Sequence, residues 1–265
     1  MKRSIPWLLL VVLLVAAGAW YLLDREPTET HPSVVALPTV EEPPEPPPAQ
    51  YPVEELVTAE AEPEPEPEPL PALGDSDPLV AEAAAGLIGP EALGTLFVTE
   101  QFINRLVATV DSLASRQVPA LIMPIQPVPG KFQVASEGEE TFIGAENADR
   151  YAPLVELLAG TDTEAMVAAY LRFYPLFQQA YEELGYQDAH FNDRVVEVID
   201  LLLATPEPDG PLRLVKPEAV YLYADESLES LAAGQKTLLR MGPEHAARVR
   251  AKLREIRAAI TAENP

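Results

Sequence analysis

An apolar run followed at once by a proline- and glutamate-rich stretch constrains this chain more than any other feature. Trp7–Leu23 holds 17 residues without a charge, which span about 25 Å as a helix, close to the hydrocarbon thickness of a bilayer. In the stretch that follows, residues 24–74, apolar side chains are too sparse to form a core. Because the apolar run has nothing there to pack against, we expect residues 7–23 to form a transmembrane helix.

The charges beside this run predict its orientation. Two basic residues precede it and acidic residues follow it within three positions. The positive-inside rule therefore places residues 1–6 in the cytoplasm and everything after Leu23 on the other side of the membrane. A cleaved signal peptide is the alternative, because Ala17-Gly18-Ala19 fits the small-x-small cleavage rule.

Residues 24–74 are expected to be a disordered Pro/Glu-rich tether. Over residues 62–69 glutamate alternates with proline, which favours an extended polyproline II segment. A tether of about 51 residues spans roughly 40 Å as a flexible coil and roughly 150 Å when extended. The domain that follows could therefore act at a distance from the bilayer.

Composition excludes several classes of function. The chain has no cysteine, which rules out disulfides, thiolate metal sites and cysteine nucleophiles. Its formal net charge of -24 repels nucleic acid, and its three histidines are too few for a histidine-rich metal cage. We therefore expect no nucleic-acid partner, no metal and no cofactor.

Helical periodicity dominates residues 75–262, which we predict to be one compact, mostly α domain, α+β at most. An aromatic stripe on residues 161–184 is expected to be core, and the apolar segment after Asn192 to be the central buried helix. The predicted helix starts are Asp77 as the N-cap before Pro78, the Gly-Pro-Glu corners 89–91 and 242–244, the beginning of an amphipathic helix over residues 96–114, Asn147, and Thr161 with Glu164 as a capping box.

The β content is expected to be small. Residues 132–134 and 141–143 predict a hairpin, and residues 212–215 and 220–223 predict short strands. Four prolines within residues 119–129 exclude a helix there and indicate an extended apolar arm. The arm either packs across the domain or binds a partner.

Three blocks of the predicted domain carry a family resemblance: YPLFQQAYEELGY (174–186), FNDRVVEVIDLLLATPEP (191–208) and AGQKTLLRMGPEHA (233–246). They are similar to a bacterial membrane-anchored family catalogued as domain of unknown function three thousand and fourteen, whose pattern covers roughly residues 75–260 here. The resemblance implies an envelope location in Gram-negative bacteria, hence an inner-membrane anchor and a periplasmic domain. It implies no activity, cofactor or catalytic residue.

Three acidic residues offer the strongest polar pattern for chemistry. Asp193, Glu197 and Asp200 lie at i, i+4 and i+7 of one predicted helix, with His190 near its start. Such a face could bind a metal if His190 and two carboxylates converged, or could serve a hydrolase if burial kept one carboxyl protonated. The simpler interpretation is that Asp193 favours the helix N-terminus and Arg194 pairs with a neighbouring acid.

Two groups of residues are candidates for contact with a partner. The candidates for a protein or cell-wall partner are His190, Asp193, Arg194, Gln235, Lys236 and Arg240. The final helix is basic and amphipathic, and its candidates for lipid or an acidic partner are Arg248, Arg250, Lys252, Arg254 and Arg257. The alternative for this helix is that its cations offset the acidic body of the domain.

The sequence therefore favours a non-enzymatic domain in the cell envelope. We expect an interaction or scaffold module that binds another envelope protein or cell-wall material. The alternatives are an envelope hydrolase that uses the carboxylates of residues 190–200, and lipid binding through the basic final helix.

Overall fold

The computed structural model describes residues 48–53, 56, 69–217 and 220–261, all within one compact unit, Glu45–Pro265. The predicted span 7–23 and most of the predicted tether lie outside the described residues. Among the helices that are described, none is by itself long and apolar enough for a membrane crossing. Helices α3 (Asp77–Ile88) and α4 (Pro90–Leu96) meet that limit only as a pair, which is bent by 114°.

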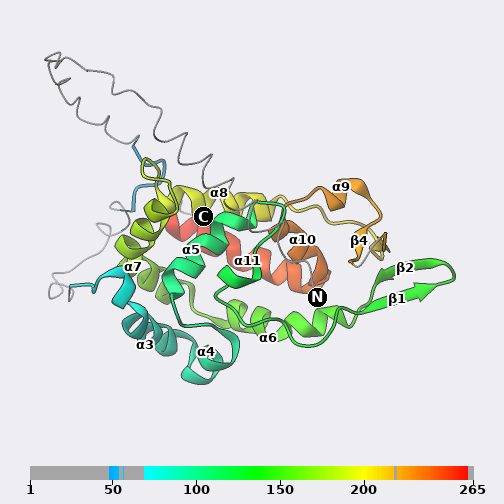
Figure 1. Cartoon of the computed structure of the whole chain (residues 1–265), viewed down its shortest axis with the longest axis horizontal. Helices are drawn as coiled ribbons and strands as arrows, with labels where there is room; N and C mark the ends of the chain where they lie inside the picture. Colours follow the sequence, from blue (N-terminus) through cyan, green and yellow to red (C-terminus); the bar gives the residue numbers. More distant parts are fainter. Residues whose placement is uncertain (1–47, 54–55, 57–68, 218–219, 262–265) are drawn as a thin grey trace, which may run out of the picture. The chain divides into compact units, whose positions relative to one another are not determined.

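The described part of the chain is mostly helical, which confirms the predicted class (Figure 1). Besides α3 and α4 it contains seven further α-helices and two short 3₁₀ helices, one before α3 and one after α5. These elements are η1 (Leu73–Asp75), α5 (Phe102–Leu113), η2 (Ala120–Ile122), α6 (Asn147–Gly160), α7 (Thr163–Glu183), α8 (Phe191–Leu203), α9 (Glu226–Glu229), α10 (Ala233–Arg240) and α11 (Pro243–Ile260).

Both predicted Gly-Pro-Glu corners are helix starts. Gly89 precedes α4 with φ 86°, and Gly242 precedes α11 with φ 81°. This left-handed backbone favours glycine, and the proline that follows each glycine takes the first helical position, where its missing N–H costs nothing. The local sequence alone therefore determines these two corners.

Three predicted helix caps are wrong. Asp77 is the first residue of α3, and the N-cap is Ser76. The N-cap of α7 is Asp162, whose carboxylate accepts the N–H of Ala165 at 2.7 Å, and Thr161 is instead buried and donates its hydroxyl to the preceding helix. Asn147 is the first residue of α6 and does not cap it. Its buried side chain bonds both backbone groups of Gln133, and so ties α6 to the chain that enters the hairpin.

Helix α5 starts at Phe102, later than predicted, because the chain before it is held in an extended form. Phe97 pairs with Ile125 in an isolated antiparallel bridge, so the apolar arm of residues 119–129 lies beside this segment. The Asp77 carboxylate then accepts the N–H groups of Gln101 and Phe102 at the start of α5. The arm thus packs along the domain, although Leu121 is 86% exposed. The prediction that its prolines exclude a helix is wrong for Ala120–Ile122, which form the short 3₁₀ helix η2.

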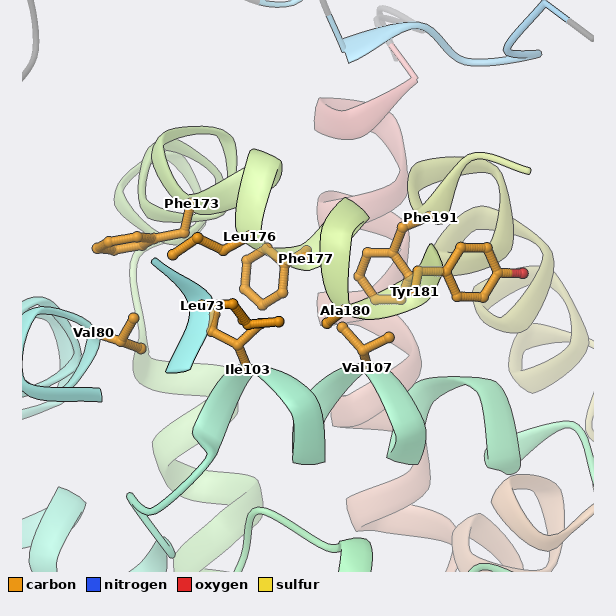
Figure 2. Close-up of a cluster of buried hydrophobic side chains, with 10 residues drawn as sticks. All are labelled: Leu73, Val80, Ile103, Val107, Phe173, Leu176, Phe177, Ala180, Tyr181 and Phe191. Carbon is orange, nitrogen blue, oxygen red and sulfur yellow. The ribbon is translucent and has the colours of Figure 1, made fainter. Parts of the chain in front are cut away.

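The aromatic stripe of α7 is core, as predicted. Figure 2 shows Phe177 and Tyr181 from α7 lying above Ile103 and Val107 of α5, with Phe191 of α8 beside them. The ring of Phe191 stacks on that of Phe177 at 5.9 Å between centroids. This packing buries the faces that helical spacing had indicated.

Helix α8 is the central helix, because different faces of it enter three apolar clusters. Phe191 joins the cluster between α5 and α7. Val198 and Leu202 pack with residues of α6, α10 and α11. Val196 and Ile199 pack with α7 and the end of α11. The apolar residues of α8 are therefore covered on several sides, and its exposed strip carries Glu197 and Asp200.

The predicted hairpin and short strands join in one antiparallel sheet. Its strands are β1 (Val134–Glu137), β2 (Glu140–Ile143), β3 (Arg213–Val215) and β4 (Leu222–Tyr223), in the order β1-β2-β3-β4. Leu214 pairs with Thr141 on one side and Tyr223 on the other, and its buried side chain packs with Leu239 of α10. Figure 1 shows the β1–β2 hairpin projecting from the helices.

Candidate functional site

The start of α8 binds a segment of the predicted tether. The Asp193 carboxylate accepts the backbone N–H of Gln50 at 2.9 Å and that of Tyr51 at 2.8 Å. The Asn192 side chain donates to the carbonyl of Tyr51 at 2.9 Å. Both backbone groups of Tyr51 are therefore paired with side chains that lie more than 140 residues later in the sequence.

Asn192 is the centre of this arrangement and is fully buried. Its amide nitrogen also donates to the carbonyl of Ile260 at the end of α11, at 3.1 Å. Its oxygen accepts the hydroxyl of Tyr170 on α7, also at 3.1 Å. One side chain therefore connects α7, α8, α11 and the docked segment.

Apolar contacts extend the docking beyond these hydrogen bonds. Val53 is only 6% exposed. Tyr51 and Leu56 pack against the buried cluster that Val167, Val196, Ile199 and Ile260 form between α7, α8 and α11. We call this surface, with Asn192 and Asp193 at its edge, the α8 groove.

Arg194 engages a second, separate set of partners. Its Nε lies 2.9 Å from the Asp111 carboxylate on α5, and its Nη1 lies 2.7 Å from Glu197. Partial burial lowers the pKa of the guanidinium, but the hydrogen bonds and charges of Glu197 and Asp111 outweigh this effect and raise the pKa. Arg194 is therefore a charged tie between α5 and α8, which matches the simpler interpretation from the sequence.

The three carboxylates at i, i+4 and i+7 share a helix but no site. Asp193 accepts from the docked segment, Glu197 pairs with Arg194, and Asp200 binds Arg257 of α11 with 2.6 Å between Oδ1 and Nε. Across the described residues, no three His, Asp or Glu side chains are placed to hold a metal ion. The convergence on His190 that a metal site would need is therefore not found among the described residues, and His190 occupies the N-cap position of α8.

A third cluster of contacts lies on α10 and contains Gln235, Lys236 and Arg240. Gln235 is buried, and its amide donates to the carbonyl of Leu201 on α8. The Lys236 ammonium is also buried and bonds both the carboxylate and the carbonyl of Glu229. A hollow of about 330 Å³ opens beside them, and the residues that line it are Arg116, Gln117, Glu226, Glu229, Ser230 and Lys236.

Tyr223 links this cluster to the sheet. Its hydroxyl donates to the carbonyl of Lys236 at 3.2 Å, and its N–H donates to Glu229. Burial raises the pKa of the Tyr223 phenol to about 12, although the positive charge of Arg240 acts in the opposite direction. Lys236, Arg240, Glu229 and Tyr223 thus connect β4 with α10, and the mixed charges of the hollow indicate no particular ligand.

The Tyr223 phenol should titrate late. Its folded pKa lies above its unfolded value of about 10, so the stability that its neutral form contributes is complete below pH 10 and is lost as the pH rises towards 12. When phenolate absorbance is measured against pH for the wild type and for Tyr223→Phe, the difference between the two curves should be a single titration step near pH 12. A difference step near pH 10 would contradict the burial of this phenol.

Three of the five cations proposed on α11 have partners within the domain. Arg250 is buried and pairs with Glu207 at 3.0 Å. Lys252 is buried and donates to the Thr161 carbonyl, the Thr163 hydroxyl and Glu255. Arg257 binds Asp200, as described above, whereas Arg254 is exposed and Arg248 partly exposed. Most of these cations therefore offset the domain's own acids.

The sequence interpretation missed the docked segment and the partners Asp111 and Glu229. One signal for the segment was present: residues 49–61 contain a single proline, and Tyr51, Val53 and Leu56 are apolar within an otherwise proline-rich stretch. Proline lacks the N–H that Asp193 accepts, so docking requires such a gap. No local signal distinguishes Asp111 or Glu229 from the other acidic residues.

Comparison with known proteins gives one match. A family model described as "Protein of unknown function (DUF3014)" matches residues 102–257. These residues include α5 to α10 and most of α11. No curated protein and no solved structure matches the chain.

Proposed function

The chain belongs to the family described as Protein of unknown function (DUF3014), and from this premise we propose that it is a cell-envelope interaction or scaffold module. In this proposal residues 7–23 anchor the chain in the inner membrane and the domain lies in the periplasm. Its partner is another envelope protein or cell-wall material. The observation that carries the proposal is the α8 groove, which holds residues 50–53 and Leu56 of the same chain.

The arrangement of the charged residues favours an interaction module over a hydrolase. A carboxyl that serves as a general acid must stay protonated near neutral pH, which requires burial without a cationic partner. Glu197 and Asp200 are exposed and each is paired with an arginine. Neither carboxyl therefore lies in the buried, unpaired setting that a general acid requires.

Binding to anionic lipid is also less favoured. A peripheral helix presents its basic residues to the membrane. On α11, Arg250 and Lys252 point into the domain and Arg257 is paired with Asp200. Of the five candidate cations on α11, this leaves Arg248 and Arg254 to contact a lipid surface. Each basic residue near an anionic membrane contributes only about 1 kcal/mol to binding.

Two measurements test the proposal. A reporter enzyme that is active only outside the cytoplasm, fused after Pro265, should be active. In three separate variants, a photo-crosslinking residue replaces Leu121, Glu139 or Tyr186. In intact cells, one of these variants should give a crosslinked adduct of constant mass. These three residues are exposed and lie on the arm, the hairpin turn and the loop before α8.

The crosslinking positions serve as controls for one another. Random collision gives adducts in similar yield from all three, whereas a specific interface favours the position that faces the partner. Equal yields, or a reporter active only in the cytosol, would overturn the proposal.

A further inference from the structure

The α8 groove recognises the backbone of the segment that it holds. Asp193 accepts two consecutive N–H groups, and Asn192 donates to the carbonyl between Tyr51 and Pro52. These bonds do not depend on side-chain identity. They do require that the first two residues are not proline, since proline has no N–H to donate.

Side chains add the selectivity. Proline at the third position is tolerated, because its nitrogen follows the last paired carbonyl and has no donor to satisfy. The next side chain, Val53, is almost fully buried, and Leu56 three positions later packs on the cluster between α7, α8 and α11. The groove therefore fits a segment with the pattern aromatic-proline-aliphatic, followed by a leucine three positions after the aliphatic residue, and both Val53 and Leu56 have helical backbone.

The attachment of the present occupant is suited to exchange. Residues 57–72 connect it to η1, so its local concentration at the groove is set by that connection. A segment held in this way can be displaced by a competitor of similar chemistry.

We propose that the α8 groove is a peptide-binding site, occupied in cis by residues 50–53 and Leu56, and that it takes a segment of the same pattern from a partner protein. This inference rests on the proposed function and specifies the partner's chemistry. When the partner binds, residues 50–56 are released, and the chain between the predicted span and the domain becomes longer. Binding of a partner and extension of the tether are thus one event.

The test uses the full chain in detergent or nanodiscs and a fluorescent peptide that corresponds to residues 48–57. A released chain carries Tyr51→Pro with Val53→Asp, which remove one N–H donor and the buried side chain and leave the groove unchanged. Fluorescence anisotropy should show saturable binding to the released chain, at least ~10-fold tighter than to the wild type, because the cis segment competes only in the latter.

Matched variants define the site. In the released chain, Asp193→Asn should weaken peptide binding at least ~10-fold, because a neutral amide is a poorer acceptor for two N–H groups. Asp188→Asn removes the same charge from the exposed loop before α8 and should leave binding unchanged. A peptide with the Tyr51→Pro and Val53→Asp changes should not bind.

A second released chain, in which Gly-Ser residues replace residues 48–56, guards against misfolding of the first. Absence of binding to both chains, when circular dichroism shows both folded, would overturn the site. Equal affinity for wild-type and released chains would overturn the occupancy in cis. If either result were obtained while crosslinking in cells was position-specific, the proposed interaction function would be kept. Only the assignment of this groove as the peptide-binding site would be rejected.

Discussion

Replacement of Asn192 with leucine is expected to lower the free energy of unfolding by about 3 kcal/mol, because it leaves buried polar groups without partners. The leucine side chain has a similar size but cannot bond the Tyr170 hydroxyl or the Ile260 carbonyl. Each unpaired buried group costs about 1–3 kcal/mol. Urea unfolding of the full chain, followed by circular dichroism, measures the loss.

A matched control separates this effect from a general intolerance of leucine. Asn104 lies on α5, is partly exposed and lines an open hollow of about 290 Å³. Asn104→Leu should change stability by less than about 0.5 kcal/mol, as is usual for surface substitutions. If Asn192→Leu and Asn104→Leu had equal effects, Asn192 would not be the connection that we describe.

Gly234→Ala should destabilise the domain by about 1–2 kcal/mol, because α10 approaches its neighbours too closely for a side chain. A Cβ at this position would lie 2.6 Å from Cδ2 of Leu202 and 3.2 Å from the carbonyl oxygen of Leu113. Helix α10 cannot easily move away, since the N–H of Ala233 at its start donates to the backbone carbonyl of Ser115 at 2.7 Å. The same urea experiment measures the change.

Gly86→Ala supplies the control of opposite sign. Gly86 lies inside α3, and a Cβ there would have no atom within 4 Å. Alanine should therefore raise stability by about 0.5–1 kcal/mol, because it reduces the entropy of the unfolded chain. If both alanines stabilised the domain, the close contact of α10 with α5 and α8 would be refuted.

The elements of the fold were largely predictable because their signals are local. The Gly-Pro corners, the hairpin around Gly138 and the aromatic stripe of α7 each depend on residues that are close in sequence. Errors arose where a tertiary contact outweighed the local signal. Asn147 is a good capping residue, but its side chain is used to hold Gln133, and the start of α5 was displaced by the pairing of Phe97 with Ile125.

The candidate site was less predictable. Helical spacing correctly placed Asp193, Glu197 and Asp200 on one helix and indicated the pairing of Arg194 with a neighbouring acid, which is Glu197. It could not indicate that Asp193 faces the docked segment or that Asp200 faces Arg257 of α11. A shared helix therefore does not imply a shared site when different neighbours cover its flanks.

The sequence by itself determined the class of the domain, its two Gly-Pro-Glu corners and most of the faces that become buried, because side-chain periodicity and backbone stiffness act over a few residues. Only the tertiary structure decided that residues 50–53 dock on Asn192 and Asp193, that Arg194 meets Asp111, and that most cations of α11 are paired within the domain. The physical reason is that a hydrogen bond or ion pair requires two groups within about 3 Å. For residues far apart in the chain, only the packing of the helices sets that distance.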